Sequence, residues 1–356
     1  MNTYAIIMAG GGGTRFWPLS RKEEPKQLLN LSGKELMINE TIDRITGVIP
    51  KKDIFIVTNH SQVGKMEEAT KTRIQKEHIL SEPAARDTAA CIGYAAMEVI
   101  EKYGDGIMCI FPSDHFIKDE ITFSRTLMSA INVAEKEDKL VTMGITPTFP
   151  STGYGYIKYD KADTEGEAFK VLEFKEKPDE ETAKKYVESG EYAWNSGMFV
   201  WKASTILKYF KKLLPDIYEN LKSMGDAMDT LEEENVISRI YPNIRSISID
   251  YGIMEKADDV VVIPAEFGWS DVGSWDNLGV LYEADDNGNI VHGNHIGVDT
   301  KNSVIYAKNK LIATIDVENV VVVETDDTVL VCKKDRSQDV RKIVDILKEQ
   351  GREEYL

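Results

Sequence analysis

Short apolar runs alternate with longer amphipathic stretches along the first 145 residues of the chain. The runs are rich in Ile, Val and Phe, which is typical of parallel strands that are buried on both faces. These runs cover residues 4–8, 54–58, 107–111 and 140–144. The stretches between them, such as 88–102 and 122–136, repeat apolar side chains at the helical period. The alternation predicts a doubly wound α/β fold with a mixed, mostly parallel sheet.

The middle of the chain, from about residue 151 to 276, mixes short strands and helices. Apolar side chains at helical spacing predict helices over 180–188 and 203–211. The acidic stretch "SMGDAMDTLEEENV", residues 223–236, predicts a further helix on the surface.

The pattern changes again after residue 282. Short β-like runs recur between polar turns from 290 to 332, which is typical of a small β domain or a few coils of a β-solenoid. An amphipathic helix closes the chain. We therefore expect a large α/β domain over 1–285 and a small C-terminal β domain with a terminal helix over 286–356.

Composition and charge limit the classes of protein to which this chain can belong. A chain of 356 residues with 42% apolar side chains can bury a sizeable core. The formal net charge of −17 argues against nucleic-acid binding, which needs a cationic surface. No run of about 18 apolar residues predicts a membrane span, and no N-terminal stretch resembles a signal peptide. Cys91 and Cys109 lie in apolar runs without a CxxC motif, which favours buried thiols in a reducing cytoplasm.

Four glycines follow the first predicted strand and lead directly into Thr14 and Arg15. Ligands of doubly wound sheets bind at the carboxyl ends of the strands, which is where this loop is expected. The run matches neither GxGxxG nor GxxxxGK[ST]. Glycine backbone N–H groups still allow close approach of a phosphate, and Arg15 and Lys26 would supply positive charge. The alternative is a plain tight turn with surface cations.

Asp114 follows the predicted strand 107–111 at the same edge of the sheet. A carboxylate that faces a glycine loop is a natural Mg²⁺ ligand. The alternative is an aspartate in a turn or at a helix cap, which is common. The five histidines show no metal-ligand spacing, and His115 is predicted to be structural.

The string "GGGGTRFWPLSRKEEPKQ" resembles the signature of the sugar-phosphate nucleotidyltransferases, which is GG-x-GTR followed by PLS and PK. Its Trp-Pro pair and Pro-Lys-Gln ending are similar to the mannose-1-phosphate guanylyltransferase branch. Further segments agree in order: "SEPAARDTAAC", "FPSDH", "TGYGYI", "FKEKPD", "WNSGMF" and "WSDVGSW". The resemblance implies a Rossmann-like nucleotidyltransferase fold for the catalytic domain. It also implies a left-handed β-helix-like C-terminal domain. Because of the length of the chain, we expect no isomerase half such as bifunctional relatives carry.

The resemblance implies transfer of GMP from GTP to mannose 1-phosphate, with release of pyrophosphate. The attacking oxygen is already anionic, so catalysis needs positioning and electrostatic stabilisation rather than a general base. The catalytic cations implied are Arg15, Lys26 and Lys177. The ligands implied for Mg²⁺, with Mn²⁺ as the alternative cation, are Asp114 and Asp271.

Nucleotide and sugar contacts are also implied by the resemblance. The nucleotide-binding residues are Gly10, Gly11, Gly13, Thr14, Glu82, Asp87 and Thr88. The carboxylates at 82 and 87 suit the two donor groups of guanine. Thr88 is as well placed to cap its helix as to touch the base. The sugar-binding residues are Gly155, Glu176 and Asn195, where glycine allows close approach and the two side chains bond to hydroxyls.

Alternatives remain at this point. One is a nucleotidyltransferase for another sugar 1-phosphate or another base. Another is a non-catalytic homologue that binds a nucleotide sugar and regulates a partner enzyme, but a binding module has no need of both the metal carboxylates and the phosphate cations. A nicotinamide-dependent oxidoreductase is disfavoured by the missing GxGxxG. The family is often oligomeric, which leaves a homodimer as one option.

Overall fold

The structure, a computed structural model, describes residues 1–165 and 167–356. By internal packing the chain forms two compact units. The first unit comprises Met1–Gly10, Ile42–Ser113 and Ile117–Trp269, and the second comprises Gly11–Thr41, Asp114–Phe116 and Ser270–Leu356. The glycine-rich segment therefore belongs to the same unit as the C-terminal strands. The domain boundary expected between residues 285 and 286 stays a prediction.

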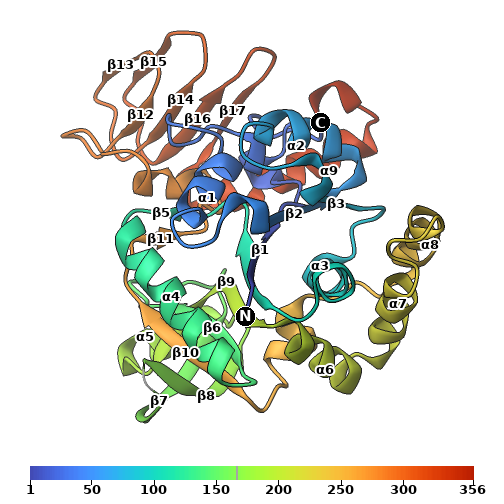
Figure 1. Cartoon of the computed structure of the whole chain (residues 1–356). Coiled ribbons are helices and arrows are strands. Elements are labelled where there is room, and N and C mark those ends of the chain that lie inside the picture. Colours follow the sequence, from blue (N-terminus) through green and yellow to red (C-terminus); the bar gives the residue numbers. More distant parts are fainter. Residues whose placement is uncertain (166) are drawn as a thin grey trace. The chain divides into compact units, whose positions relative to one another are not determined.

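A nine-stranded sheet forms the centre of the first unit, in the order β3–β2–β1–β4–β9–β6–β10–β8–β7 (Figure 1). Its strands are β1 (Thr3–Met8), β2 (Ile54–Asn59), β3 (Ile79–Glu82), β4 (Ile107–Pro112), β6 (Leu140–Ile145), β7 (Tyr156–Glu165), β8 (Ala168–Lys175), β9 (Tyr192–Lys202) and β10 (Val260–Ala265). The group β3–β2–β1–β4 is parallel, as is the pair β6–β10. β9 lies antiparallel between β4 and β6, and β8 pairs antiparallel with β7 and β10. All four strands predicted from apolar runs are confirmed, and parallel pairing is confined to the two groups named.

Four helices of the first unit match the ranges predicted over 88–102, 122–136, 180–188 and 203–211. The helices of this unit are α2 (Val63–Thr70), α3 (Asp87–Tyr103), α4 (Glu120–Lys136), α5 (Glu180–Ser189), α6 (Ala203–Leu213), α7 (Pro215–Gly225) and α8 (Glu233–Ile240), while α1 (Met37–Ile45) begins in the second unit's segment. The single helix predicted over 223–236 is wrong, because α7 ends at Gly225 and turns precede α8. Asp229 lies in those turns with a left-handed φ of 58°, which a helix does not accommodate. The described residues include no helix with the length and apolar character needed to cross a membrane.

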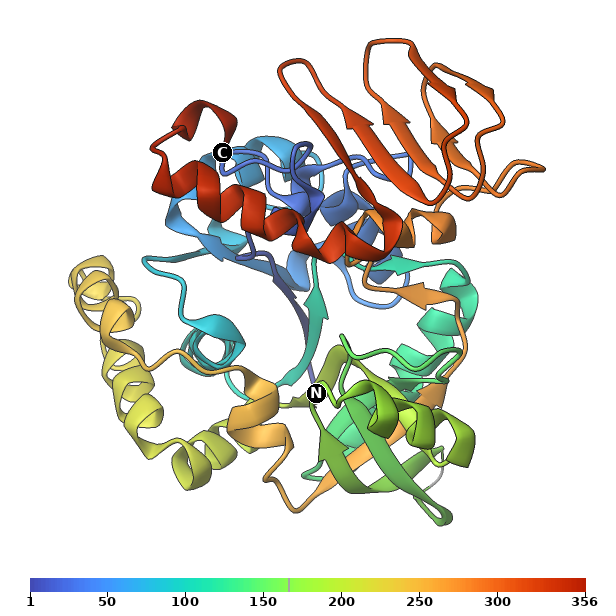
Figure 2. The same ribbon diagram turned by 180° about the vertical axis from the view of Figure 1, so that it is seen from behind.

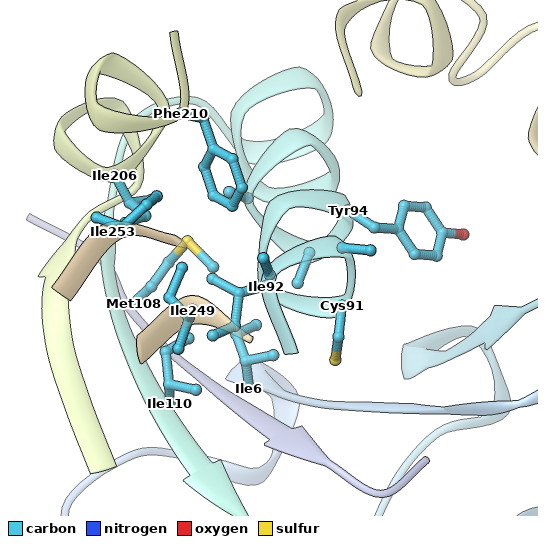
Figure 3. Close-up of a cluster of buried hydrophobic side chains, with 14 of the residues drawn as sticks. Ile6, Cys91, Ile92, Tyr94, Met108, Ile110, Ile206, Phe210, Ile249 and Ile253 are labelled. Atoms are coloured by element: carbon cyan, nitrogen blue, oxygen red, sulfur yellow. The ribbon is translucent and has the colours of Figure 1, made fainter. Parts of the chain in front are cut away.

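Alternate side chains of the central strands face opposite sides of the sheet. Ile6 and Ile110 point toward α3, where they belong to the same buried cluster as Ile92 (Figure 3). The next residue of β4, Phe111, instead packs against Phe123 of α4, with ring centroids 6.1 Å apart. Because successive side chains of a strand point to opposite faces, the sheet carries helices on both sides.

The second unit contains two small sheets and a terminal helix (Figure 2). Its strands are β12 (Ile290–His292), β13 (His295–Val298), β14 (Val304–Ala307), β15 (Ile312–Ile315), β16 (Val320–Glu324) and β17 (Val329–Lys333), and the helix is α9 (Val340–Glu349). β12, β14 and β16 pair in parallel, as do β13 and β15, whereas β17 is antiparallel to β16. Successive passes of the chain thus stack in register, as in a β-helix-like domain, while the handedness stays a prediction. Two short strands, β5 (Phe116–Ile117) and β11 (Trp269–Ser270), lie where the chain passes between units.

The glycine-rich segment folds onto the C-terminal part of its own unit. We call residues 11–29 the signature loop. Phe16 of this loop shares a buried core with Trp275 and with Val344 of α9. The indole N–H of Trp275 donates to the carbonyl of Trp17 at 3.1 Å, and the Trp17 indole donates to the carbonyl of Tyr355 at 2.7 Å. The loop's backbone is therefore fixed by residues near the end of the chain.

Gly13 is the position where this packing requires glycine. Its φ is +58°, and a Cβ there would come within 2.4 Å of Lys26 Cβ and 2.8 Å of the Lys26 backbone nitrogen. A Cβ on Gly11, by contrast, would meet no atom of the described residues within 4 Å.

Gly13→Ala should therefore lower the free energy of unfolding by about 2–3 kcal/mol, because the new methyl group clashes with the backbone and φ is unfavourable. Gly11→Ala is the matched control and should change it by less than about 1 kcal/mol. Urea unfolding followed by tryptophan fluorescence measures both. Equal stability of the two variants would show that the Gly13–Lys26 contact is not tight.

Candidate functional site

The ammonium group of Lys26 is buried in the second unit, with 5% of the residue exposed. It donates to Asp114 Oδ2 at 2.8 Å, to the Asp114 carbonyl at 3.1 Å and to the Asp271 carbonyl at 2.6 Å. All three donors of the ammonium are thereby used, as a buried charge requires. We call Lys26, Asp114 and Asp271 the Lys26 cluster. It joins three segments that are far apart in the sequence.

Asp114 is held in its ionised form. Partial burial opposes ionisation, but the charges of Lys26 and His115 and the Lys26 hydrogen bond keep the pKa of Asp114 below its usual value. The carboxylate of Asp271 turns back toward the following loop, since a Cβ on Gly273 would lie 2.7 Å from Asp271 Oδ2. The structure thus brings both expected metal ligands to the same lysine. Their role as ligands stays a prediction.

The donor set around Lys26 fits a hard cation that also binds phosphate. Among residues 1–165 and 167–356, no group of three or more His, Cys, Asp and Glu side chains could hold a metal ion by itself. Mg²⁺ commonly takes one or two protein carboxylates and completes its shell with phosphate oxygens and water. The Asp114 carboxylate lies beside Lys26, and Asp271 is held at the same lysine through its backbone carbonyl, an arrangement compatible with that mode of binding.

Arg15 lies in the 3₁₀ turn η1 (Thr14–Phe16) of the same unit, near enough to Asp114 for its charge to help lower the pKa of that carboxyl. Its guanidinium donates through Nη1 to Gln338 Oε1 at 3.2 Å, a contact that the sequence did not suggest. Gln27, which is buried, donates from Nε2 to the Gly11 carbonyl at 3.1 Å and so fixes the start of the signature loop. Thr14 stabilises the same turn through its carbonyl, which accepts from the backbone of Trp17.

The predicted base loop belongs to the first unit and begins at the end of β3. Tyr241 donates its hydroxyl to Glu82 Oε1, while Glu82 Oε2 lies 2.8 Å from where a Cβ of Gly10 would be. Burial raises the pKa of Glu82 to about 6, although the Tyr241 hydrogen bond opposes this. One oxygen of the carboxylate is thus already engaged by the protein.

Asp87 and Thr88 have separate partners. Asp87 is exposed, has a left-handed φ of 64° and accepts from the Thr88 backbone N–H at 2.7 Å. The Thr88 hydroxyl oxygen accepts from the backbone N–H of Ile249 at 2.8 Å. Thr88 therefore ties the base loop to a distant segment. We expected Thr88 to cap its helix or to touch the base, and this hydrogen bond is neither of these.

A second cluster in the first unit contains all three residues expected for the sugar. A Cβ on Gly155 would come within 2.3 Å of Glu176 Oε2 and 3.2 Å of Asn195 Cβ. The Asn195 side chain donates from Nδ2 to Asp250 Oδ1 at 2.8 Å, and its Oδ1 accepts from the backbone of Gly197. We call Gly155, Glu176, Asn195 and Asp250 the Glu176 cluster.

Two features of this cluster are typical of ligand sites. Glu176 Oε2 is buried and accepts no hydrogen bond from the described residues. Burial and the neighbouring Glu176 charge raise the pKa of Asp250 to about 6. Carboxylates held in such surroundings are enriched at functional sites.

Lys177 adjoins the Glu176 cluster. Its ammonium pairs with Glu176 Oε1 at 3.0 Å, and its φ of 47° is unusual for a residue other than glycine. Partial burial opposes protonation, but the hydrogen bond and charge of Glu176 raise the pKa of Lys177 above its ordinary value. The group is therefore protonated at neutral pH.

Sequence reasoning missed Asp250. The residue opens a π-helical turn, η7 (Asp250–Met254), a geometry that is frequent at functional sites. No apolar period or motif considered above marks that turn. Only its contact with Asn195 reveals it.

Comparisons with known proteins agree with the resemblance. A family model described as Nucleotidyl transferase matches residues 4–287, and one described as MannoseP isomerase/GMP-like beta-helix domain matches residues 293–347. "Xanthan biosynthesis protein XanB" of Xanthomonas campestris pv. campestris is 42% identical over 350 residues, 98% of this chain and 74% of the relative. "Mannose-1-phosphate guanylyltransferase" of Escherichia coli strain K12 is 40% identical over 359 residues, 99% of this chain and 75% of the relative.

A solved structure is similar over almost the whole chain. It is described as mannose-1-phosphate geranyltransferase from Thermus thermophilus, with a TM-score of 0.88 and 32% identity, and the match covers 98% of this chain and 100% of that one. The chain belongs to the nucleotidyl transferase family. Within that family it is similar to mannose-1-phosphate guanylyltransferases, at about 40% identity.

The raised pKa of Asp250 predicts a pH-dependent effect on stability. Between about pH 4 and 6 the folded protein retains a proton that the unfolded chain has released, so the free energy of unfolding falls as pH rises. Asp250→Asn cannot ionise and can still accept from Asn195. It should therefore be more stable than the wild type by about 2–3 kcal/mol at pH 7.5.

Urea unfolding at pH 4 and pH 7.5 tests this expectation. The extra free energy of unfolding of Asp250→Asn over the wild type should shrink toward pH 4. At that pH the wild-type carboxyl is protonated in the folded state and about half protonated in the unfolded chain. Asp286→Asn, a change of an exposed aspartate, is the control and should show no such trend. A loss of stability in Asp250→Asn at pH 7.5 would contradict the assignment.

Proposed function

We propose that this chain transfers GMP from GTP to α-D-mannose 1-phosphate, forming GDP-mannose and releasing pyrophosphate. The observation that carries the chemistry is the Lys26 cluster, a buried ammonium that holds Asp114 and the Asp271 loop together. The choice of GTP and mannose 1-phosphate rests on relatives such as the Escherichia coli mannose-1-phosphate guanylyltransferase.

The reaction forms one phosphorus–oxygen bond and breaks another. A phosphate oxygen of the sugar 1-phosphate attacks the α-phosphorus of GTP, and the bond from that phosphorus to the β-phosphate oxygen breaks. Pyrophosphate leaves with the electron pair, so no proton needs to be moved. The protein has to align the two anions and offset their repulsion, which preorganised cations do well.

We assign the cations by their surroundings. Lys26, which is buried and fully hydrogen-bonded, organises the metal carboxylates and contributes positive charge at the nucleotide phosphates. Arg15, which is exposed, is available to the leaving pyrophosphate. Lys177, a cation beside Glu176, faces the reacting phosphates in this proposal.

The carboxylates of Asp114 and Asp271 would hold a divalent cation, Mg²⁺ in the first instance. When bound, such an ion neutralises phosphate oxygens and fixes their geometry. The lowered pKa of Asp114 supports this role, because only the ionised carboxylate is a strong ligand. Mn²⁺ is the alternative cation.

Substrate recognition is divided among the remaining residues. Backbone groups of Gly10, Gly11, Gly13 and Thr14 bind nucleotide phosphates in this proposal. Glu82 and Asp87 accept from guanine, and Thr88 holds their loop in place. The Glu176 cluster binds the sugar. The buried oxygen of Glu176 and the carboxylate of Asp250 accept from hydroxyls, and the absence of a side chain at Gly155 lets the Glu176 carboxylate take its place in the cluster.

The setting of the protein is also a proposal. Cys91 and Cys109 are buried, and burial raises the pKa of both thiols, which suits unreactive cysteines in a reducing cytoplasm. A homodimer stays a proposal. The principal rival function is nucleotidyl transfer with another base or sugar, and a regulatory homologue that binds but does not turn over is the second.

Pyrophosphate release across a matrix of nucleoside triphosphates and sugar 1-phosphates tests the proposal. GTP with mannose 1-phosphate should be the best pair, and GDP-mannose should be the second product. Replacing GTP by ATP should lower kcat/KM by about tenfold to a hundredfold for each lost base contact. Lys26→Ala should lower turnover by about a hundredfold or more, whereas exposed Lys34→Ala should leave it unchanged.

Three outcomes would contradict the proposal. Pyrophosphate release without a sugar phosphate would indicate a hydrolase. A better rate with another pair would favour the rival transferase. Tight binding of GDP-mannose without any turnover would favour the regulatory homologue.

A further inference from the structure

The amide side chain of Gln338 bridges two parts of the second unit that the proposed function uses. Gln338 lies in η9 (Lys334–Asp339), just before the terminal helix. Its Oε1 accepts from Arg15 Nη1 at 3.2 Å, and its Nε2 donates to Ser274 Oγ at 2.8 Å. Ser274 is fully buried and is three residues beyond Asp271. The bridge therefore links Arg15 to the loop that carries an expected metal ligand.

The orientation of the Gln338 amide is determined by its neighbours. Ser274 uses its only hydroxyl proton to donate to Asp276 Oδ1. Ser337, which is buried, donates to the same oxygen of Asp276. Ser274 Oγ can then only accept from its remaining neighbour, so the Gln338 NH₂ group must face Ser274. The amide oxygen is left to face Arg15.

Arg15 therefore donates to a neutral group, the amide oxygen of Gln338. An exposed arginine loses rotamer freedom, of the order of 2 kcal/mol, when a ligand fixes it. A carboxylate partner would orient the guanidinium but would also neutralise part of its field. An amide oxygen orients it through a hydrogen bond and leaves the full charge for an anionic ligand.

We propose that Gln338 is a positioning residue that orients Arg15 toward the phosphates of the nucleotide. The C-terminal segment would thereby contribute directly to the phosphate site, beyond supporting the fold. Two hydrogen bonds of Trp17 support this, since they fix the loop that carries Arg15: its carbonyl accepts from the Trp275 indole, and its own indole donates to the Tyr355 carbonyl. The inference rests on the proposed function for its reaction, but it also makes a claim about GTP binding alone.

A double-mutant cycle tests the inference. Gln338→Ala should lower kcat/KM for GTP about fivefold to tenfold, which is the usual effect of one lost hydrogen bond. Because Gln338 acts through Arg15, adding Gln338→Ala to Arg15→Ala should cause no further loss. The KM for the sugar phosphate should not change. Gln350→Ala, a matched change of another exposed glutamine near the chain end, should have no effect.

Gln338→Glu separates orientation from charge. Glutamate can still accept from Arg15, but it places a negative charge beside the phosphates; it also loses the donation to Ser274, which Gln338→Ala loses as well. It should therefore raise the KM for GTP more than Gln338→Ala does. Equal or better GTP use by Gln338→Glu would overturn the claim that a neutral partner is required.

Further results would overturn the inference as a whole. One is that Gln338→Ala lowers kcat/KM for GTP equally in the wild type and in Arg15→Ala. Another is that the loss of kcat/KM in Gln338→Ala is matched by a fall in thermal stability. Both would indicate a structural role. The same double-mutant cycle can be measured without turnover, by calorimetric titration of GTP into the wild type and each variant. Absence of transfer by the wild type would thus refute the proposed function while leaving the Gln338–Arg15 coupling measurable.

Discussion

Lys26 carries a positive charge into the interior of the second unit, and its three hydrogen bonds there hold three segments of chain together. An unpaired ammonium in that place would be strongly unfavourable, so Asp114 and the Asp271 carbonyl must be where they are for the unit to fold. Gly13 is confined to glycine by the same packing. The groups that stabilise this lysine are also those proposed to bind metal and phosphate. Folding and function therefore depend on one arrangement.

The first unit contains the reverse arrangement at the Glu176 cluster, where the buried Oε2 of Glu176 has no hydrogen-bond partner among the described residues. The segment 241–250 contributes to this cluster and also contacts the base loop: Tyr241 donates to Glu82, and Asp250 accepts from Asn195. Burial raises the pKa of Glu82 and of Asp250 to about 6, although the hydrogen bonds from Tyr241 and Asn195 oppose this. Functional sites often contain such destabilising groups, because a bound ligand supplies the hydrogen-bond donors that the folded protein lacks.

Much of this arrangement could be predicted from residues close together in the chain. Apolar runs predicted strands such as β1 and β4, and the signature loop predicted Lys26. The partners could not be predicted in the same way, because Lys26 and Asp114 are 88 positions apart and Arg15 and Gln338 are 323 apart. Asp250 and Gln338 lie outside the motifs that were recognised. The helix predicted through Asp229 was wrong because acidic residues at helical spacing do not reveal a left-handed turn.

The most direct test of the account measures how tightly Mn²⁺ binds at the Lys26 cluster. The relaxation rate of water protons reports the binding. The wild type should bind Mn²⁺ weakly alone and at least about tenfold more tightly with GTP present, because phosphate oxygens complete the metal's shell. Asp114→Asn and Asp271→Asn should each remove the gain that GTP produces, while the exposed control Asp286→Asn should retain it. If both variants keep the full GTP-dependent gain, the metal and the triphosphate bind elsewhere, and the account of the Lys26 cluster is wrong.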